Sequence, residues 1–255
     1  MSDETWDLLL AQVKGADYRG QVGLYLHHEP LLVKDLGRKI RDVNRRTRAF
    51  VVLSTNGALL TPIRRRELIE AGPNTVHVNI SSADPEQYSR IMRLPWEATR
   101  ENTLAFAREA RGRVNVEINV PRLPEVDVSL FGKVFPGVKV NLESWANSRG
   151  GLLQDVSAKG RGSRFKIGGH CRQPTQNLNV LHDGSVIVCC QDWGHESKES
   201  FPKITEANLF ETYAGERMNA IRSEFRAGNY ERFAMCDACS LEMGFSRLRS
   251  LPEVT

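Results

Sequence analysis

The residues best suited to chemistry in this chain are its cysteines, and all of them lie in the last third. They are Cys171, Cys189, Cys190, Cys236 and Cys239, and the first 170 residues contain none. Cys236 and Cys239 form a Cys-x-x-Cys pair, a spacing that lets two thiolates reach one metal centre from a single tight turn. Cys171 precedes an expected β-hairpin and Cys189 follows it, so the folded hairpin can bring four thiolates together.

Three uses of these cysteines compete on spacing alone. A four-cysteine zinc site needs the same ligands, although zinc ribbons usually contain two Cys-x-x-Cys pairs and this chain has one. A redox pair is disfavoured, because Cys236-x-x-Cys239 does not follow a strand in a βαβ unit. Unligated, buried cysteines account for at most one of the five. The spacing therefore supports an iron–sulfur site and a zinc site about equally.

Composition restricts the class of protein further. The 255 residues are 40% hydrophobic and 26% charged, with a formal net charge of +4. No apolar run approaches the roughly 20 residues of a membrane span, and the acidic start MSDETWDLLL is unlike an export signal, so we expect a cytoplasmic protein that does not contact a membrane. The arginine runs at 45–48 and 64–66 lack interleaved aromatic residues, which argues against nucleic acid as a partner.

Strand and helix patterns alternate through the first part of the chain. Strands are expected at 21–26, 50–54, 75–80, 114–120 and 138–142, after an amphipathic helix at 3–14 and with helices between them. Thr61-Pro62 and Asp84-Pro85 are typical helix starts, and Gly72 is a typical helix end. This alternation predicts a parallel sheet, and five strands make only a partial barrel, since a complete one takes eight strands and roughly 250 residues.

Polar residues follow several of the expected strands. Ligands of parallel α/β sheets bind at the carboxyl ends of the strands. Those ends carry His28-Glu29-Pro30, Thr55-Asn56-Gly57, Ser81-Ser82, Pro121 and Ser144-Trp145.

A second domain is expected after residue 148. A basic, glycine-rich linker occupies 149–162, and a hairpin at 177–188 turns at Asp183-Gly184. Short helices are expected at 207–213 and 214–227. The sequence thus predicts an α/β domain at 1–148 and a small α+β domain at 149–255.

Three segments of the first domain resemble motifs of the radical S-adenosylmethionine (SAM) superfamily. Residues 29–32, Glu-Pro-Leu-Leu, resemble the end of its G-G-E-P-L-L motif, and 54–57 resemble its T-N-G strand end. Residues 76–82 resemble the strand that normally reads I-x-V-S-I-D-G. The resemblance implies a partial (β/α) TIM-like barrel that lacks its first strand.

The cysteine region resembles the family's C-terminal SPASM or "twitch" extension. Cys171, Gly184 and Cys189 fit its C-x9–15-G-x4-C signature, and Cys236-x-x-Cys239 fits the form with one auxiliary four-iron four-sulfur cluster. The resemblance implies that Cys171, Cys189, Cys236 and Cys239 ligate this cluster. Cys190 is the spare thiol, able to exchange roles with Cys189.

The resemblance also implies a SAM site at the strand ends. Its residues are Glu29, Pro30, Thr55, Asn56, Asn79 and Ser81. Glu29 is implied to approach the methionine amino group, and Thr55 and Asn56 to line the same mouth. Asn79 and Ser81 occupy positions that face the methionine carboxylate or the ribose.

The departures from the family pattern concern the radical cluster. The family holds this cluster with C-x3-C-x2-C after the first strand, and this sequence has no such triplet. His27 and His28 replace the two glycines of the motif and add bulk where SAM binds. The chain alone is therefore not expected to cleave SAM, and a missing N-terminal segment or a partner chain is expected to complete the barrel.

Three functions follow from these observations, and no catalytic residue is identified for any of them. The first is SAM-dependent radical oxidation or modification of a sugar, a cyclitol or a peptide, as in an oxidoreductase or maturase. The second is a non-catalytic iron–sulfur protein that transfers electrons or binds a partner. The third is a protein with a structural zinc ion on the same cysteines.

Overall fold

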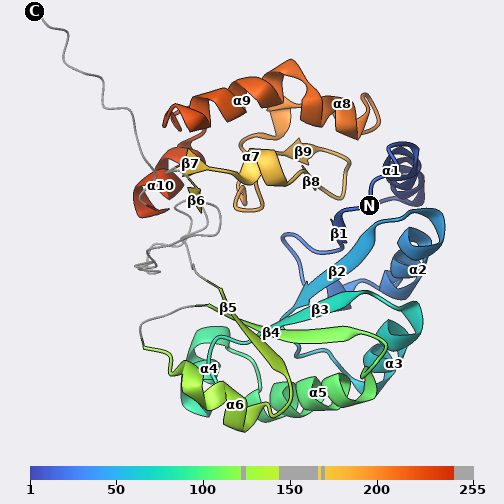
Figure 1. Cartoon of the computed structure of the whole chain (residues 1–255), viewed down its shortest axis with the longest axis vertical. Coiled ribbons are helices and arrows are strands. Elements are labelled where there is room, and N and C mark those ends of the chain that lie inside the picture. The colour runs from blue at the N-terminus through green and yellow to red at the C-terminus, as the bar shows by residue number, and fades with distance from the viewer. Residues whose placement is uncertain (122–124, 144–165, 168–169, 244–255) are drawn as a thin grey trace, which may run out of the picture. The chain divides into compact units, whose positions relative to one another are not determined.

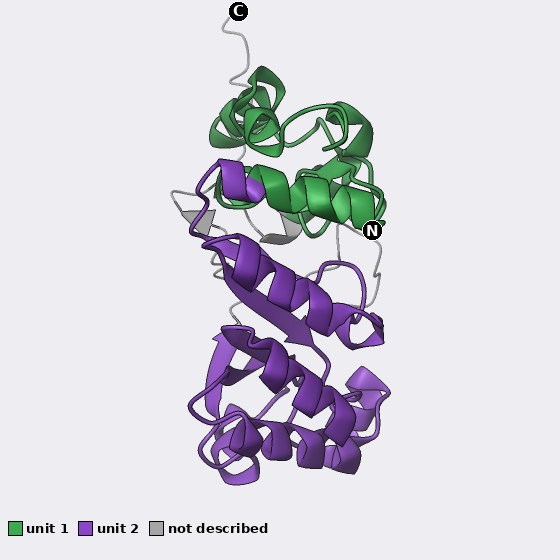
Figure 2. Ribbon diagram, turned by 90° about the vertical axis from the view of Figure 1, so that its right-hand side faces the viewer, with its two compact units in different colours: residues 1–12, 144–255 green, residues 13–143 purple. Residues whose placement is uncertain are grey.

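The computed structural model describes residues 1–121, 125–143, 166–167 and 170–243. These form two compact units, one of residues 13–143 and one of residues 1–12 with 144–255 (Figure 2). The predicted boundary at 148/149, the linker at 149–162 and the strand end Ser144-Trp145 lie outside the described residues. No helix in the described part of the chain is long and apolar enough to cross a membrane.

A five-stranded parallel sheet is the centre of the unit at 13–143, as the alternation predicts (Figure 1). The strands follow one another in chain order across the sheet: β1 (Gln21–Gly23), β2 (Phe50–Thr55), β3 (Thr75–Asn79), β4 (Asn115–Pro121) and β5 (Lys139–Glu143). Strand β1 is shorter than the expected 21–26. The sheet is open, and the order and parallel direction of its strands are those of a partial barrel.

Two helices of this unit begin at the predicted start signals, and one of them also ends at the predicted glycine. The helices are α2 (Leu36–Arg46), α3 (Pro62–Ala71), α4 (Pro85–Met92), α5 (Trp96–Glu109) and α6 (Phe131–Val134), with 3-10 turns η1 (Pro30–Leu32) and η2 (Val128–Leu130). The hydroxyl group of Thr61 accepts a hydrogen bond from Arg64 N, and Asp84 accepts one from Gln87 N. Gly72 ends α3 with a φ of 72°. The side chains of Thr61 and Asp84 thus pair with N–H groups that have no partner within the first turn of their helices.

The two faces of the sheet differ in polarity. Val51, Leu53, Val76, Val78 and Ile118 are fully buried. Alternate residues on β3 and β4 are polar and point to the opposite face.

The second unit is a small α+β arrangement around its own core. Its elements are β6 (Lys166–Ile167), β7 (His170–Cys171), α7 (Gln173–Gln176), β8 (Asn179–Val180), β9 (Val186–Ile187), η3 (Lys198–Ser200), α8 (Leu209–Ala214), α9 (Glu216–Arg226) and α10 (Ala234–Met243). Strands β8 and β9 form the predicted antiparallel hairpin. Gly184 has a φ of 84° in its turn, a conformation that favours glycine.

The first twelve residues join this C-terminal unit. They belong to helix α1 (Asp3–Gly15). The side-chain amide of Gln12 donates to Ile204 O at 3.0 Å and accepts from Leu209 N at 2.7 Å. Leu9 packs against the core of the same unit. Helix α1 thus contributes both a polar and an apolar contact to the cysteine-bearing unit.

Candidate functional site

Glu29 is the centre of the predicted strand-end site. It precedes η1, and its Oε1 accepts hydrogen bonds from Thr55 Oγ1 at 2.6 Å and Leu31 N at 3.1 Å. Its Oε2 accepts from Asn56 N at 2.9 Å. The structure therefore brings Glu29, Pro30, Thr55 and Asn56 together, with room on Oε2 for one further donor.

The other two predicted residues lie at the end of β3 and just beyond it. Asn79 donates from Nδ2 to Ser54 Oγ at 2.8 Å. Ser81 is 3% exposed, and its buried hydroxyl oxygen has no hydrogen-bond partner in the described part of the chain. Since burying an unpaired hydroxyl group is unfavourable, Ser81 is suited to bind a ligand group.

The polar face of the sheet continues this site across β3, β4 and β5. Asn79, Asn119 and Asn141 are register partners on adjacent strands, so their side chains share one face. Asn141 Nδ2 donates to Asn119 Oδ1 at 3.2 Å. Of this row, only Asn79 was predicted from the sequence. Asn119 and Asn141 lie on strands in which apolar and polar residues alternate. Strands of parallel sheets are usually apolar throughout, so this alternation is the sequence signal that indicates a polar face.

Glu117 lies on the same face of the sheet, two residues before Asn119 on β4. Its pKa is the most strongly shifted among the described acidic groups of the sheet. Its carboxylate accepts hydrogen bonds from Lys139 Nζ at 2.8 Å, Asn115 Nδ2 at 2.8 Å and Asn141 Nδ2 at 2.6 Å, and His77 Nδ1 lies 3.6 Å away. Burial opposes ionisation, but these hydrogen bonds outweigh it and lower the pKa of Glu117 from 4.5 to about 2. The polar face thus carries a fixed, neutralised carboxylate and a row of uncharged amides.

The four predicted metal ligands border a single hydrophobic core. Cys236 is part of this core, and Cys171, Cys189 and Cys239 pack against it. Cys190 is not among the described residues that pack there. The core also contains Tyr230, Phe233, Phe225, Met218, Ile221 and Val188.

The thiols influence one another electrostatically. Burial raises the pKa of Cys171 to about 11. The pKa of Cys236 is raised by burial and then by Cys171, Cys239 and two carboxylates. The pKa of Cys189 is raised by a hydrogen bond with Cys190 and by burial. The four thiols around this core have the donor chemistry that a metal cluster needs, since metal binding itself removes their protons.

The backbone around the cysteines differs from expectation at one place. The Cys236-x-x-Cys239 pair lies in helix α10 instead of a tight turn, and the i, i+3 spacing places both thiols on one face of that helix. Within the described residues, no group of three or more His, Cys, Asp or Glu side chains is close enough to hold a metal ion. The donor set fits an iron–sulfur cluster, and binding would have to draw the thiols together, as metals commonly do when they couple to folding.

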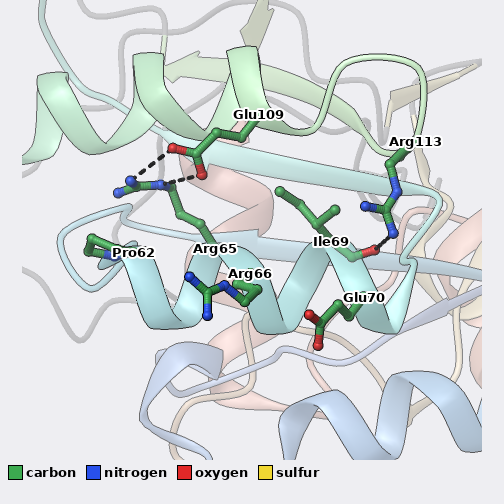
Figure 3. Close-up of a pocket in the computed structure, with 7 residues that line it drawn as sticks. All are labelled: Pro62, Arg65, Arg66, Ile69, Glu70, Glu109 and Arg113. Carbon is green, nitrogen blue, oxygen red and sulfur yellow. Dashed lines mark hydrogen bonds and ion pairs between the residues drawn. The ribbon is translucent and has the colours of Figure 1, made fainter.

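A separate surface pocket lies between α3 and α5 (Figure 3). Arg65 on its wall is bound by Glu109 at 2.9 and 3.0 Å and donates also to Leu60 O and Asn102 Oδ1. Arg113 donates to Ile69 O at 3.2 Å. These contacts use four of the five N–H donors of Arg65, so the pocket's main feature is an ion pair that joins two helices.

Two family models match the chain and account for this arrangement. Residues 2–131 match the radical SAM superfamily, and residues 171–240 match SPASM, an iron–sulfur cluster-binding domain. The chain belongs to the radical SAM superfamily, and its C-terminal unit contains the SPASM match. These domains imply an iron–sulfur cluster and SAM as ligands, and all four predicted cysteine ligands lie inside the SPASM match.

A curated relative with a similar sequence is a "Probable GTP 3′,8-cyclase" from Pyrobaculum aerophilum, 32% identical over 157 residues. The match covers 61% of this chain and 48% of the relative. The chain thus spans about half the length of that relative.

Solved structures show the same fold. The complex of BtrN with AdoMet and 2-DOIA matches with a TM-score of 0.66 and 18% identity, over 92% of this chain and 78% of BtrN. anSMEcpe with AdoMet and the Cp18Cys peptide matches with a TM-score of 0.61 and 13% identity, over 92% and 80%. SuiB of Streptococcus suis matches with a TM-score of 0.57 and 12% identity, over 86% and 61%. At these identities the likeness is one of fold.

Proposed function

We propose that the C-terminal unit binds one four-iron four-sulfur cluster through Cys171, Cys189, Cys236 and Cys239. The observation that carries this proposal is that all four cysteines border one hydrophobic core. When bound, such a cluster supplies electron transfer or an iron that can anchor a substrate. The chain's own contribution is to exclude water from the thiolates and to fix them on β7, the end of the β8–β9 hairpin and α10.

The strand-end site is proposed to bind SAM. The carboxylate of Glu29 retains acceptor capacity on Oε2 and suits an ammonium group. The unpaired hydroxyl group of Ser81 and the amide of Asn79 suit a carboxylate or ribose hydroxyl groups. Glu29 is held by three hydrogen bonds before any ligand arrives, so little ordering is needed on binding.

The proposed activity is SAM-dependent radical oxidation or modification of a small molecule rich in hydroxyl groups, or of a peptide. The uncharged amides of Asn79, Asn119 and Asn141 both donate and accept hydrogen bonds, as a sugar or cyclitol requires. The structural relatives support both substrate classes, because BtrN was solved with 2-DOIA and anSMEcpe with a peptide.

A second candidate is an iron–sulfur protein that does not cleave SAM by itself. It is favoured by the absence of any cysteine before Cys171 in this sequence, since the family's radical cluster needs three. In that case the chain transfers electrons or binds a partner. Strand β1 is an edge of the described sheet, and an edge strand offers backbone groups for a partner chain to pair with.

Metal analysis after anaerobic reconstitution tests the cluster. About four irons and four acid-labile sulfides per chain are expected, and Cys239→Ser should lose most of this iron. Cys190→Ser is the matched control, because Cys190 is not among the described residues that pack on the core, and it should retain the iron. One zinc without sulfide would instead support the structural zinc protein.

Product analysis separates the two candidates. The reconstituted chain is incubated with SAM and dithionite, and 5′-deoxyadenosine is measured against a sample without protein. Formation of 5′-deoxyadenosine by the chain alone contradicts the second candidate. Its absence from a chain that carries the cluster and binds SAM supports that candidate.

A further inference from the structure

The loop that follows Cys189 is organised around a buried carboxylate. Asp192 is fully buried. Its Oδ1 accepts a hydrogen bond from Glu196 N at 2.8 Å, and its Oδ2 accepts from Ser197 N at 3.0 Å and Ser197 Oγ at 2.5 Å. Three donors on one carboxylate close residues 189–197 into a compact loop.

Ser197 connects this carboxylate to the strand before Cys189. Its hydroxyl oxygen, bonded to Asp192, accepts a hydrogen bond from Val188 N at 2.9 Å. Asp192 N in turn donates to Cys189 O at 3.1 Å. The backbone on both sides of the Cys189 thiol is therefore tied to Asp192, directly or through one residue.

Glu196 connects the same loop to the helix that carries the other two ligands. Its Oε2 accepts a hydrogen bond from Met235 N at 3.2 Å, in the first turn of α10. The N–H groups of a first helical turn lack partners within the helix, and a carboxylate there is favourable. Met235 precedes Cys236 directly.

We propose that Asp192 is a positioning residue for the metal cluster, which fixes Cys189 relative to Cys236 and Cys239 through Ser197 and Glu196. This inference rests on the proposed cluster and adds residues to which no role in binding it is assigned. Asp192 holds the loop in shape, and Glu196 attaches the loop to α10. The segment after Cys189 thereby stays joined to the helix that carries Cys236 and Cys239.

The two carboxylates have a second consequence for the cluster. Both lie beside proposed ligands, because Asp192 N donates to Cys189 O at 3.1 Å and Glu196 Oε2 accepts from Met235 N, next to Cys236. Negative charge near an iron–sulfur cluster disfavours the addition of an electron and lowers the reduction potential. Asp192 and Glu196 are therefore expected to make this cluster harder to reduce.

The test uses the full chain with its cluster reconstituted anaerobically. The reduction potential is measured by dye-mediated titration followed by electron paramagnetic resonance, and the rate of iron loss to a chelator is measured separately. Asp192→Asn should raise the potential and speed iron loss at least several-fold. Asp183→Asn is the matched control, because Asp183 bonds Ser185 N and Oγ at 3.0 Å in the β8–β9 turn, and it should leave both values unchanged.

Glu196→Gln keeps the proposal testable if Asp192→Asn does not fold. Glu196 is exposed, so its replacement should be tolerated, and the loss of its charge should still raise the potential. Wild-type potential and iron loss in both variants would overturn the positioning role while the cluster itself stands. A wild-type chain without iron and sulfide would contradict the proposed function, and the inference with it.

Discussion

The carboxylate of Glu29 and the hydroxyl group of Thr55 are joined by a 2.6 Å hydrogen bond, although 26 positions separate them in the chain. The bond connects the turn after β1 to the end of β2. Asn56 N donates to the other oxygen of the same carboxylate. The geometry of the strand-end site therefore depends on a part-buried polar contact between the turn after β1 and the end of β2.

Thr55→Val removes this hydrogen bond and conserves the shape of the side chain. The expected loss of unfolding free energy is about 2 kcal/mol, because the acceptor is charged and half-buried. Affinity for SAM should fall in parallel. Urea unfolding and SAM titration check both effects. Thr75→Val, on β3, removes only a 3.5 Å contact with Asn115 and should change stability by less than about 0.5 kcal/mol.

Gly57→Ala should distort the turn that positions Asn56. Gly57 has a φ of +78°, and a Cβ there would lie 2.7 Å from Val78 Cγ1. Gly112 has a φ of +76° but nothing within 4 Å of such a Cβ. Gly112→Ala should cost about 1 kcal/mol of backbone strain, and Gly57→Ala about 1–3 kcal/mol more from overpacking. Equal denaturation midpoints for the two variants would contradict this account.

Glu117 should make stability depend on acid pH. Its pKa in the folded chain is about 2, against an ordinary 4.5. Because its pKa is lower in the folded chain, the ionised Glu117 stabilises the fold. This stabilisation is complete above pH 4.5 and is lost as the pH falls from 4.5 towards 2. We expect Glu117 to contribute about 2 kcal/mol to the unfolding free energy. The contribution is modest because Lys139 is exposed and water screens its charge.

The measurement compares unfolding free energies at pH 7 and pH 3 for the wild type and Glu117→Gln. The variant should lose less stability over this interval, because its side chain no longer titrates. Glu101→Gln, an exposed position on α5, should follow the wild-type pH dependence. A variant with the same pH dependence as the wild type would show that Glu117 is not the group responsible.

Arg65→Lys should weaken the attachment of α3 to α5. A lysine cannot reproduce the two parallel bonds to Glu109 or the additional bonds to Leu60 O and Asn102. The expected loss is about 1–3 kcal/mol in denaturant unfolding, as for hydrogen bonds to charged groups, because Glu109 is partly exposed. Arg66→Lys, at the exposed neighbouring position (Figure 3), should stay within about 0.5 kcal/mol of the wild type.

Sequence by itself determined the features of this protein that depend on local patterns. The alternation of strands and helices, the caps at Thr61 and Asp84, the end of α3 at Gly72 and the hairpin turn at Gly184 were all predicted and are confirmed. Each arises from interactions between residues close in the chain, where side-chain type and spacing decide the conformation. The five-stranded parallel sheet follows from the same alternation, and the matches to the family models confirm the resemblance that the motifs gave.

Tertiary structure alone decided which side chains meet. The register of β3, β4 and β5 places Asn79, Asn119 and Asn141 in one row, and the sequence had identified only the first. The helical conformation of Cys236-x-x-Cys239 and the loop around Asp192 were likewise absent from the prediction. Such contacts join segments tens of residues apart, and their energy is gained only after both segments are folded and packed, so no local pattern encodes them.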